Sequence, residues 1–262
     1  MLIDTHCHLN YEYDGGKTAS DLIREAETAG VGILITIATD PGNFDAVQRI
    51  SDQHANVYHT IGVHPHEATL VTPEALMAIR RHATHPKCVA IGEIGLDYYY
   101  THSPREKQME ECRSQLEIAI DLQKPVVIHS RDGEDDLLPL LKEYASRQKG
   151  ASLGVIHCFS GTEAFGQACL DLGFYISLSG ILTFKNSEAL RQAVRSYPLE
   201  RLLVETDAPY LAPAPLRGKK CEPSMVKHTA LKLAEVKGVS FEELAEITTR
   251  NAMECFHLNP PV

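Results

Sequence analysis

Short apolar runs rich in β-branched residues recur along the whole chain, and their number strongly limits the folds open to it. Eight such runs occur, at residues 2–5, 33–38, 57–63, 89–95, 126–129, 154–157, 174–178 and 202–205. Most of them are nearly continuous apolar stretches, which is typical of strands that are covered on both faces. The chain is therefore expected to form a sheet that helices enclose.

Between the runs lie segments with helical patterning and recognisable starts. Each start has a serine or threonine as N-cap, followed by proline in the first turn or by glutamate three residues later. The clearest are Thr72-Pro73, Ser103-Pro104-Arg105-Glu106 and Ser240-x-x-Glu243. The second is expected to open a long helix that ends near Gln123.

Successive runs start about 20 to 37 residues apart, which is the size of one βα unit. Eight such units favour a closed (β/α)8 barrel of the TIM type, an α/β fold of roughly 250 residues. The alternative is an open, doubly wound sheet, but no GxGxxG motif follows the first run. No linker or short-period repeat interrupts the chain, so we expect a single domain over residues 1–262.

Composition excludes several classes of protein. The seven cysteines are scattered without a CxxC pair, which argues against a disulfide framework or a zinc ribbon. A net charge of −10 argues against a broad basic surface for duplex nucleic acid. No apolar run approaches the roughly 18 residues of a membrane span, and the N-terminus has no signal-peptide pattern, so a cytoplasmic location is expected.

Side chains that can bind metals stand at the carboxyl ends of six runs, where barrel enzymes keep their catalytic groups. They are His6 and His8, His64 and His66, Glu93 and Asp97, His129 and Asp132, His157, and Glu205 and Asp207. Buried charges without partners are strongly disfavoured, so this pattern requires cations at its centre. Four histidines and two carboxylates provide enough ligands for two divalent ions.

The first of these ends contains two histidines two residues apart. Alternate residues of a strand point to the same face, so Asp4, His6 and His8 should share one face and Cys7 should point away. By the same alternation, Cys158 should point away from the metals. Asp4 is expected either to orient a histidine or to cap a nearby turn.

Glu93, on a middle strand, is the best candidate for a ligand shared by both ions. A carboxylate has two oxygens and can bridge two metals, whereas a neutral imidazole offers one free nitrogen. Mixed imidazole and carboxylate ligands suit Zn²⁺ or Mn²⁺, and Mg²⁺ is a further possibility.

Six segments, in order, resemble motifs of the TatD family of metal-dependent hydrolases. They are DTHCHL at residues 4–9, GVHPH at 62–66, GEIGLDYY at 92–99, PVVIHSRD at 125–132, VIHCFSG at 155–161 and VETDAPYLAP at 204–213. The resemblance covers essentially the whole chain. It implies a (β/α)8 fold and a two-metal phosphodiesterase, typically a deoxyribonuclease.

The resemblance also implies how the ligands divide between the two metals. One ion would take His6, His8, Glu93 and Asp207, and the other would share Glu93 and take His129 and His157. His64 and Glu205 stand where the family has active-site residues. The loop after the last strand departs from the family pattern, because Cys221 replaces a common asparagine and its hydrogen bond.

The expected reaction is hydrolysis of a phosphodiester by a water molecule that the two ions activate. Asp207, or Glu205 beside it, would accept the proton of that water, and His64 would contact the substrate. The expected substrate is DNA, as a single strand or at an end, and the protein is expected to be a monomer.

Further residues are expected to meet the substrate around the barrel mouth. Arg131 shares a face with His129 and would either bind phosphate or pair with an aspartate nearby. A compact basic cluster after the last strand would contact phosphates along the DNA; it consists of Arg217, Lys219 and Lys220. Asp97 and the tyrosines at 98–100 are expected to form a loop over the mouth, with base stacking as a second role.

Two other functions compete with a nuclease. The first is a two-metal hydrolase of a small molecule or ester, such as an aminoacyl ester or a lactone, because ligand spacing does not separate these substrates. The second is a non-enzymatic scaffold, which would require a closed coordination sphere without an exchangeable water. Six ligands shared by two ions leave open positions, which favours an enzyme.

Overall fold

Eight parallel strands form one sheet whose spatial order follows the sequence. The computed structural model describes residues 1–150 and 152–258. Its strands are β1 (Leu2–Cys7), β2 (Val31–Ile37), β3 (Val57–Ile61), β4 (Cys88–Asp97), β5 (Val126–Arg131), β6 (Gly154–Ile156), β7 (Tyr175–Leu178) and β8 (Leu202–Val204). A parallel bridge between Cys7 and Ala208 joins the two edges of the sheet. The (β/α)8 barrel is therefore confirmed.

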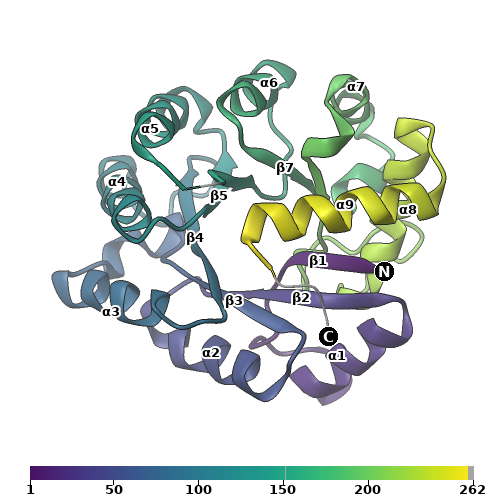
Figure 1. Ribbon diagram of the computed structural model, residues 1–262, viewed down its shortest axis with the longest axis horizontal. Coiled ribbons are helices and arrows are strands. Elements are labelled where there is room, and N and C mark those ends of the chain that lie inside the picture. The colour runs from purple at the N-terminus through teal and green to yellow at the C-terminus, as the bar shows by residue number, and fades with distance from the viewer. Residues whose placement is uncertain (151, 259–262) are drawn as a thin grey trace.

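Helices surround the ring of strands, as Figure 1 shows. They are α1 (Ala19–Thr28), α2 (Phe44–Gln53), α3 (Pro73–Ala83), α4 (Arg105–Leu122), α5 (Glu134–Arg147), α6 (Glu163–Leu172), α7 (Glu188–Ser196), α8 (Val226–Lys237) and α9 (Phe241–Phe256). The main apolar core lies between these helices and the outward faces of the strands. Over residues 1–150 and 152–258, none of the helices has the length and apolar character that crossing a bilayer demands.

Two of the three predicted helix starts are confirmed. Thr72 Oγ1 accepts a hydrogen bond from Ala75 N at 3.2 Å, and Ser240 Oγ accepts one from Glu243 N at 3.1 Å. The capping box at Ser103 is wrong, because α4 begins after Pro104, which caps it without a side-chain hydrogen bond. The Ser103 hydroxyl instead donates to the carbonyl of His66 at 2.7 Å.

Helix α9 closes the amino end of the barrel and crosses the ring of strands in Figure 1. Its residues Ala252, Cys255 and Phe256 belong to one cluster with apolar side chains of the strands, and we call this cluster the floor core. The strand residues of the floor core are Ile3, Ile33, Ile35, Ile37, Val89, Ala90, Val127, Val155, Tyr175 and Leu203. The amino end of the barrel is therefore filled with apolar side chains.

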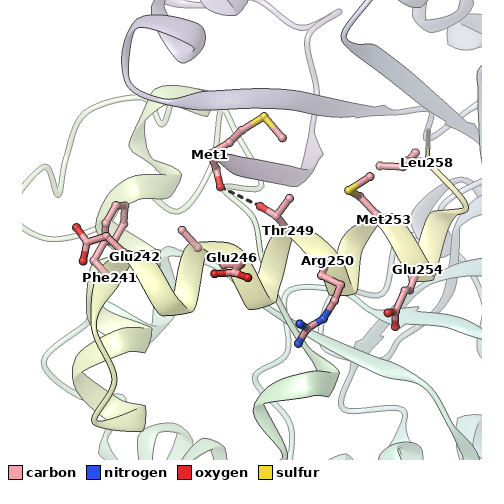
Figure 2. Close-up of a pocket in the computed structure, with 10 residues that line it drawn as sticks. Met1, Phe241, Glu242, Glu246, Thr249, Arg250, Met253, Glu254 and Leu258 are labelled. Carbon is pink, nitrogen blue, oxygen red and sulfur yellow. Dashed lines mark hydrogen bonds between the residues drawn. The ribbon is translucent and has the colours of Figure 1, made fainter. Parts of the chain in front are cut away.

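A surface cavity of about 680 Å³ lies where Met1 meets α9 (Figure 2). Thr249 Oγ1 donates to the carbonyl of Met1 at 2.9 Å, and charged side chains such as Glu242 and Arg250 stand at its edge. The three groups of metal-binding side chains found among residues 1–150 and 152–258 involve none of its lining residues. They all lie around a second cavity, at the carboxyl end of the barrel.

Candidate active site

A cavity of about 570 Å³ opens at the carboxyl ends of the strands. Histidines and carboxylates from six of these ends are among the residues that line it: His8, His64, Glu93, His129, His157 and Asp207. His6 lies next to them and is almost fully buried. The fold thus brings together the side chains that the sequence placed at separate strand ends.

Glu93 is at the centre of the histidines. Its Oε1 lies 2.7 Å from His157 Nε2, 3.0 Å from His129 Nδ1 and 3.4 Å from His64 Nε2. Its Oε2 lies 3.4 Å from His6 Nε2. A single carboxylate therefore faces imidazole nitrogens with both of its oxygens, as a bridging ligand must.

Asp207 faces the two histidines of β1. Its Oδ1 lies 3.6 Å from His6 Nε2 and 3.5 Å from His8 Nε2. These three side chains form one of the three groups that could hold a metal ion. The other two groups both contain Glu93, one with His6 and His157 and the other with His64 and His129.

The donors in this cluster fit metal ions better than they fit one another. Both ring nitrogens of His6 are buried and have no hydrogen-bond partner within the described residues. An orphaned nitrogen of this kind is costly unless something else fills its coordination. Neutral imidazole nitrogens and carboxylate oxygens are the ligands that Zn²⁺ and Mn²⁺ accept.

Electrostatics within the cluster favour ionised carboxylates. Burial alone would raise the pKa of Glu93, but the nearby His157, His64 and His6 hold this pKa well below its ordinary value. Burial alone would lower the pKa of His157, yet Glu93 and Glu205 raise it well above the ordinary value. The carboxylate is therefore present as the anion that a cation requires.

The pKa values of Asp207, His6 and His64 are all lowered. Burial tends to raise the pKa of Asp207, but the hydrogen bond from His8 and the charge of His6 lower it. Burial lowers the pKa of His6, and His157 lowers it further. Burial also lowers the pKa of His64 to about 4, so that its imidazole is neutral at pH 7.

A close approach of β4 to β5 sets the position of Glu93 relative to His129. Gly95 pairs with His129 across the two strands and has a φ of 144°. A Cβ atom at Gly95 would lie 2.0 Å from the carbonyl oxygen of His129. Only glycine therefore allows the two strands to meet at this point.

The β1 strand matches the sequence analysis in part. Cys7 points into the core and its thiol donates to the carbonyl of Ile35 at 3.5 Å, as alternation predicts. The pairing of β1 with β2 shifts register between Asp4 and Cys7, and Asp4 contacts no histidine ring. Its carboxylate accepts hydrogen bonds from Thr206 N at 2.9 Å and Thr206 Oγ1 at 2.6 Å, so it joins β1 to the segment after β8 and neither orients a histidine ring nor caps a nearby turn.

Cys158 is a correction to the sequence analysis, because it lines the cavity instead of pointing away. Alternation fails there, since β6 ends at Ile156 and Cys158 has a φ of 45°. Its backbone N–H donates to Glu205 Oε1 at 2.7 Å, and the same oxygen lies 3.3 Å from His157 Nδ1. Glu205 is fully buried and lies behind His157, outside the cavity lining.

The sequence predicts a loop at Asp97, but Asp97 is the buried last residue of β4. Its Oδ2 accepts hydrogen bonds from His66 Nε2 at 2.8 Å and His129 Nε2 at 3.1 Å. Its Oδ1 accepts from the backbone N–H groups of Tyr99 and Tyr100. The spacing of Glu93 and Asp97 along one strand is the sequence feature that could have assigned Asp97 to the site.

The basic residues expected near substrate divide into two groups. Arg131 lines the cavity, and its guanidinium stacks 4.1 Å from the ring centre of Tyr99. The other group, Arg217, Lys219 and Lys220, does not line the cavity. Within it, Arg217 stacks on Phe184 at 3.8 Å and Lys220 donates to the carbonyl of Glu12.

Comparison with known proteins identifies the family of the chain. The family model described as TatD related DNase matches residues 3–257. The chain is 42% identical to the metal-dependent hydrolase YcfH of Escherichia coli K12, over 99% of this chain and 97% of that protein. It is 34% identical to the 3'-5' ssDNA/RNA exonuclease TatD of Klebsiella pneumoniae, over 91% and 92% of the two chains.

A solved structure leads to the same family. The crystal structure of YjjV, a TatD homologue from Escherichia coli K12, superposes with a TM-score of 0.90. The two chains are 28% identical, and the match covers 98% of each. The matched residues of the family model include every histidine and carboxylate of the cluster. The chain belongs to the TatD-related DNase family and is a metal-dependent hydrolase.

Proposed function

We propose that the protein is a two-metal phosphodiesterase that degrades DNA from a single-stranded end. The observation that carries this proposal is the position of Glu93, whose two oxygens face four histidines beside a second carboxylate, Asp207. Two-metal sites of this kind are well suited to displacement at phosphorus, because ions can neutralise charge on both reacting oxygens. The name of the Klebsiella relative supports a single-stranded substrate and an exonuclease.

We expect these ligands to divide between two ions. His6, His8 and Asp207 would hold one ion, and His129 and His157 would hold the other. Glu93 would be shared by both. His64 Nε2 lies 3.4 Å from Glu93 Oε1 and would either complete the coordination of the second ion or contact the substrate.

When bound, the ions would lower the pKa of water towards neutrality and polarise the phosphoryl oxygen. Asp207 would accept the proton, because it is ionised and lines the cavity with 15% of its side chain exposed. Glu205 is enclosed behind His157 and would instead hold that imidazole through Nδ1. Arg131 would offset charge on the phosphate from the rim.

A small-molecule or ester hydrolase is the second candidate. It is favoured by the net charge of −10 and by the basic cluster at Arg217, Lys219 and Lys220, which does not line the cavity. Aminoacyl esters and lactones need fewer contacts beyond the cavity than a polynucleotide does.

The test begins with protein stripped of metal and supplied in turn with Mg²⁺, Mn²⁺ or Zn²⁺. Each form is assayed on end-labelled single-stranded DNA, duplex DNA, an aminoacyl-tRNA and a lactone. The proposal expects stepwise shortening of the single strand from one end, only after metal is returned. Turnover of the ester or lactone, without cleavage of DNA by any metal form, would support the second candidate and contradict the first.

A further inference from the structure

Exposed tyrosines gather at the mouth of the cavity. The chain has ten tyrosines, all within the described residues, and three of them are exposed: Tyr99, Tyr100 and Tyr210, at 57%, 44% and 52%. Tyr100 and Tyr210 both line the cavity. The neighbouring Tyr98 differs, because it is buried and its hydroxyl donates to Asp136. Exposed aromatic faces are thus concentrated where substrate would enter.

The tyrosines at the mouth lie on opposite rims. Tyr100 follows β4 and Tyr210 follows β8, and these strands are four positions apart in a ring of eight. Between the two rims lie the metal-binding side chains that line the cavity. A single strand of nucleic acid that crosses the mouth would therefore pass one aromatic ring on each side of the metal-binding side chains.

The β4 rim is rigid and carries a positive charge. The Arg131 guanidinium stacks over Tyr99 at 4.1 Å and Tyr100 at 5.0 Å from the ring centres. The backbone N–H groups of both tyrosines are held by Asp97 Oδ1 at 3.0 and 2.9 Å. The other oxygen of Asp97 accepts from His129, so this rim is fixed directly to the metal cluster.

The β8 rim is built against a proposed metal ligand. Tyr11 stacks on His8 with a centre-to-centre distance of 4.7 Å, and its hydroxyl lies 3.0 Å from Thr39 Oγ1. Tyr210 meets both rings edge to face, at 6.2 Å from His8 and 6.3 Å from Tyr11. Tyr210 is still about half exposed, which leaves ring surface for another planar group.

We propose that these rims form a nucleobase clamp, in which Tyr100 with Arg131 holds one unpaired base and Tyr210 holds another, on either side of the scissile phosphate. The clamp deepens the proposed nuclease function and rests on it. Aromatic rings and guanidinium planes stack on any base, so the clamp is tolerant of sequence. It requires unstacked bases, which selects single strands over a duplex.

The test compares a normal single-stranded oligonucleotide with one of equal length whose end nucleotides are abasic. The two probes carry the same phosphates and differ only in the bases available for stacking. Affinity is measured by fluorescence anisotropy, with Ca²⁺ replacing the catalytic metal so that the probe is not consumed. Wild-type protein should bind the normal probe more tightly by about 5- to 100-fold for each of the two bases held, since stacking contributes that factor per base.

Two variants separate stacking from a structural role. Tyr100→Leu and Tyr210→Leu should each remove most of this preference, by weakening the normal probe and leaving the abasic probe unchanged. Tyr58→Leu is the control, because Tyr58 packs against the floor core at the other end of the barrel. It should retain the full preference.

Three results would overturn the clamp. They are equal wild-type affinity for both probes, equal losses on both probes in the tyrosine variants, and no loss on either probe. Cleavage of DNA is assayed separately with the catalytic metal. If DNA is cleaved while base preference is absent, only the clamp has failed; if no DNA is bound or cleaved, the nuclease proposal has failed with it.

Discussion

Oε1 of Glu93 lies 2.7 Å from Nε2 of His157, and this contact is the shortest between a carboxylate and an imidazole in the metal-binding cluster. Both side chains are almost fully buried. The contact joins β4 to the residue after β6 and skips β5, so the cluster lies inside the barrel and not along one edge of it. Its charge balance can be tested one residue at a time.

Glu93→Gln should lower metal content and nearly abolish turnover while the barrel still folds. Glutamine keeps the shape of the side chain but removes the negative charge that a shared ligand supplies. The loss in kcat should exceed about 100-fold, since even partners outside the coordination sphere change metal sites by about 10- to 100-fold. Elemental analysis and circular dichroism are the measurements. Glu111→Gln, at a buried glutamate of α4, is the control, and wild-type turnover of the Glu93 variant would exclude a shared ligand.

Cys7→Ala should leave metal content and activity unchanged. The thiol is buried in the main core and contacts the carbonyl of Ile35. Removing it should cost about 1–2 kcal/mol of unfolding free energy, as for a small buried side chain. Metal analysis and chemical denaturation measure the two effects. Loss of one metal equivalent would show that Cys7 faces the cluster in the loaded enzyme.

Asp97→Asn should weaken metal binding by about 10- to 100-fold, because Asp97 accepts a hydrogen bond from the far nitrogen of His129. That hydrogen bond directs the other nitrogen of His129 towards Glu93. Titration calorimetry of the metal-free protein measures the change, with the exposed Asp121→Asn as control. Unchanged metal affinity would limit Asp97 to holding the backbone of the tyrosines.

Changing Arg217, Lys219 and Lys220 together to alanine should weaken DNA binding and reduce its dependence on salt. Each phosphate contact contributes roughly 0.7 to the slope of log affinity against log salt for single strands. The expected reduction is smaller than the full sum, because Arg217 and Lys220 also contact the protein. Hydrolysis of a small aryl phosphodiester should be unaffected. A variant lacking Arg80, Arg81 and Arg113 on the outer helices matches the charge change, and an equal effect there would indicate net charge alone.

His59 should make the protein less stable below about pH 6.5. This histidine is buried, its Nδ1 lies 2.8 Å from Ser51 Oγ, and burial together with His85 lowers its pKa to about 3. Between these pH values the unfolded chain binds a proton that the folded chain does not. The unfolding free energy therefore suffers no loss from His59 above about pH 6.5. Below that pH it falls by about 1.4 kcal/mol per pH unit on acidification.

The measurement is urea denaturation of wild type and His59→Gln from pH 7 to pH 4. The variant should show a shallower loss of unfolding free energy across this range. His54→Gln, which changes a partly exposed histidine nearby, should keep the wild-type slope. Parallel curves for wild type and His59→Gln would contradict the assignment.

Periodicity and strand-end chemistry predicted the barrel and most of the cluster because both depend on local sequence. Runs of apolar residues locate strands, and parallel strands necessarily bring their carboxyl ends together. The approach failed where the backbone leaves the regular strand. Cys158 lines the cavity because its left-handed conformation breaks the alternation after β6.

The length of β4 is the second feature that the sequence does not predict correctly. The strand continues to Asp97, two residues beyond the predicted end, and that continuation buries the carboxylate which binds His129. The capping box at Ser103 failed for a related reason, since the Ser103 hydroxyl found the carbonyl of His66 across the fold. Contacts between distant segments decide such positions, and no local pattern encodes them.

The floor core has a consequence for how this enzyme can change over evolutionary time. Its apolar side chains, such as Val127 and Leu203, lie on strands whose next inward residues belong to the cluster or support it. The apolar filling of the barrel interior and the catalytic chemistry thus lie towards opposite ends of the barrel. Insertions and substitutions in the loops at the mouth can therefore alter which substrate is accepted. The floor core at the opposite end of the barrel is unaffected by such changes, so new specificities can evolve while the chain stays folded.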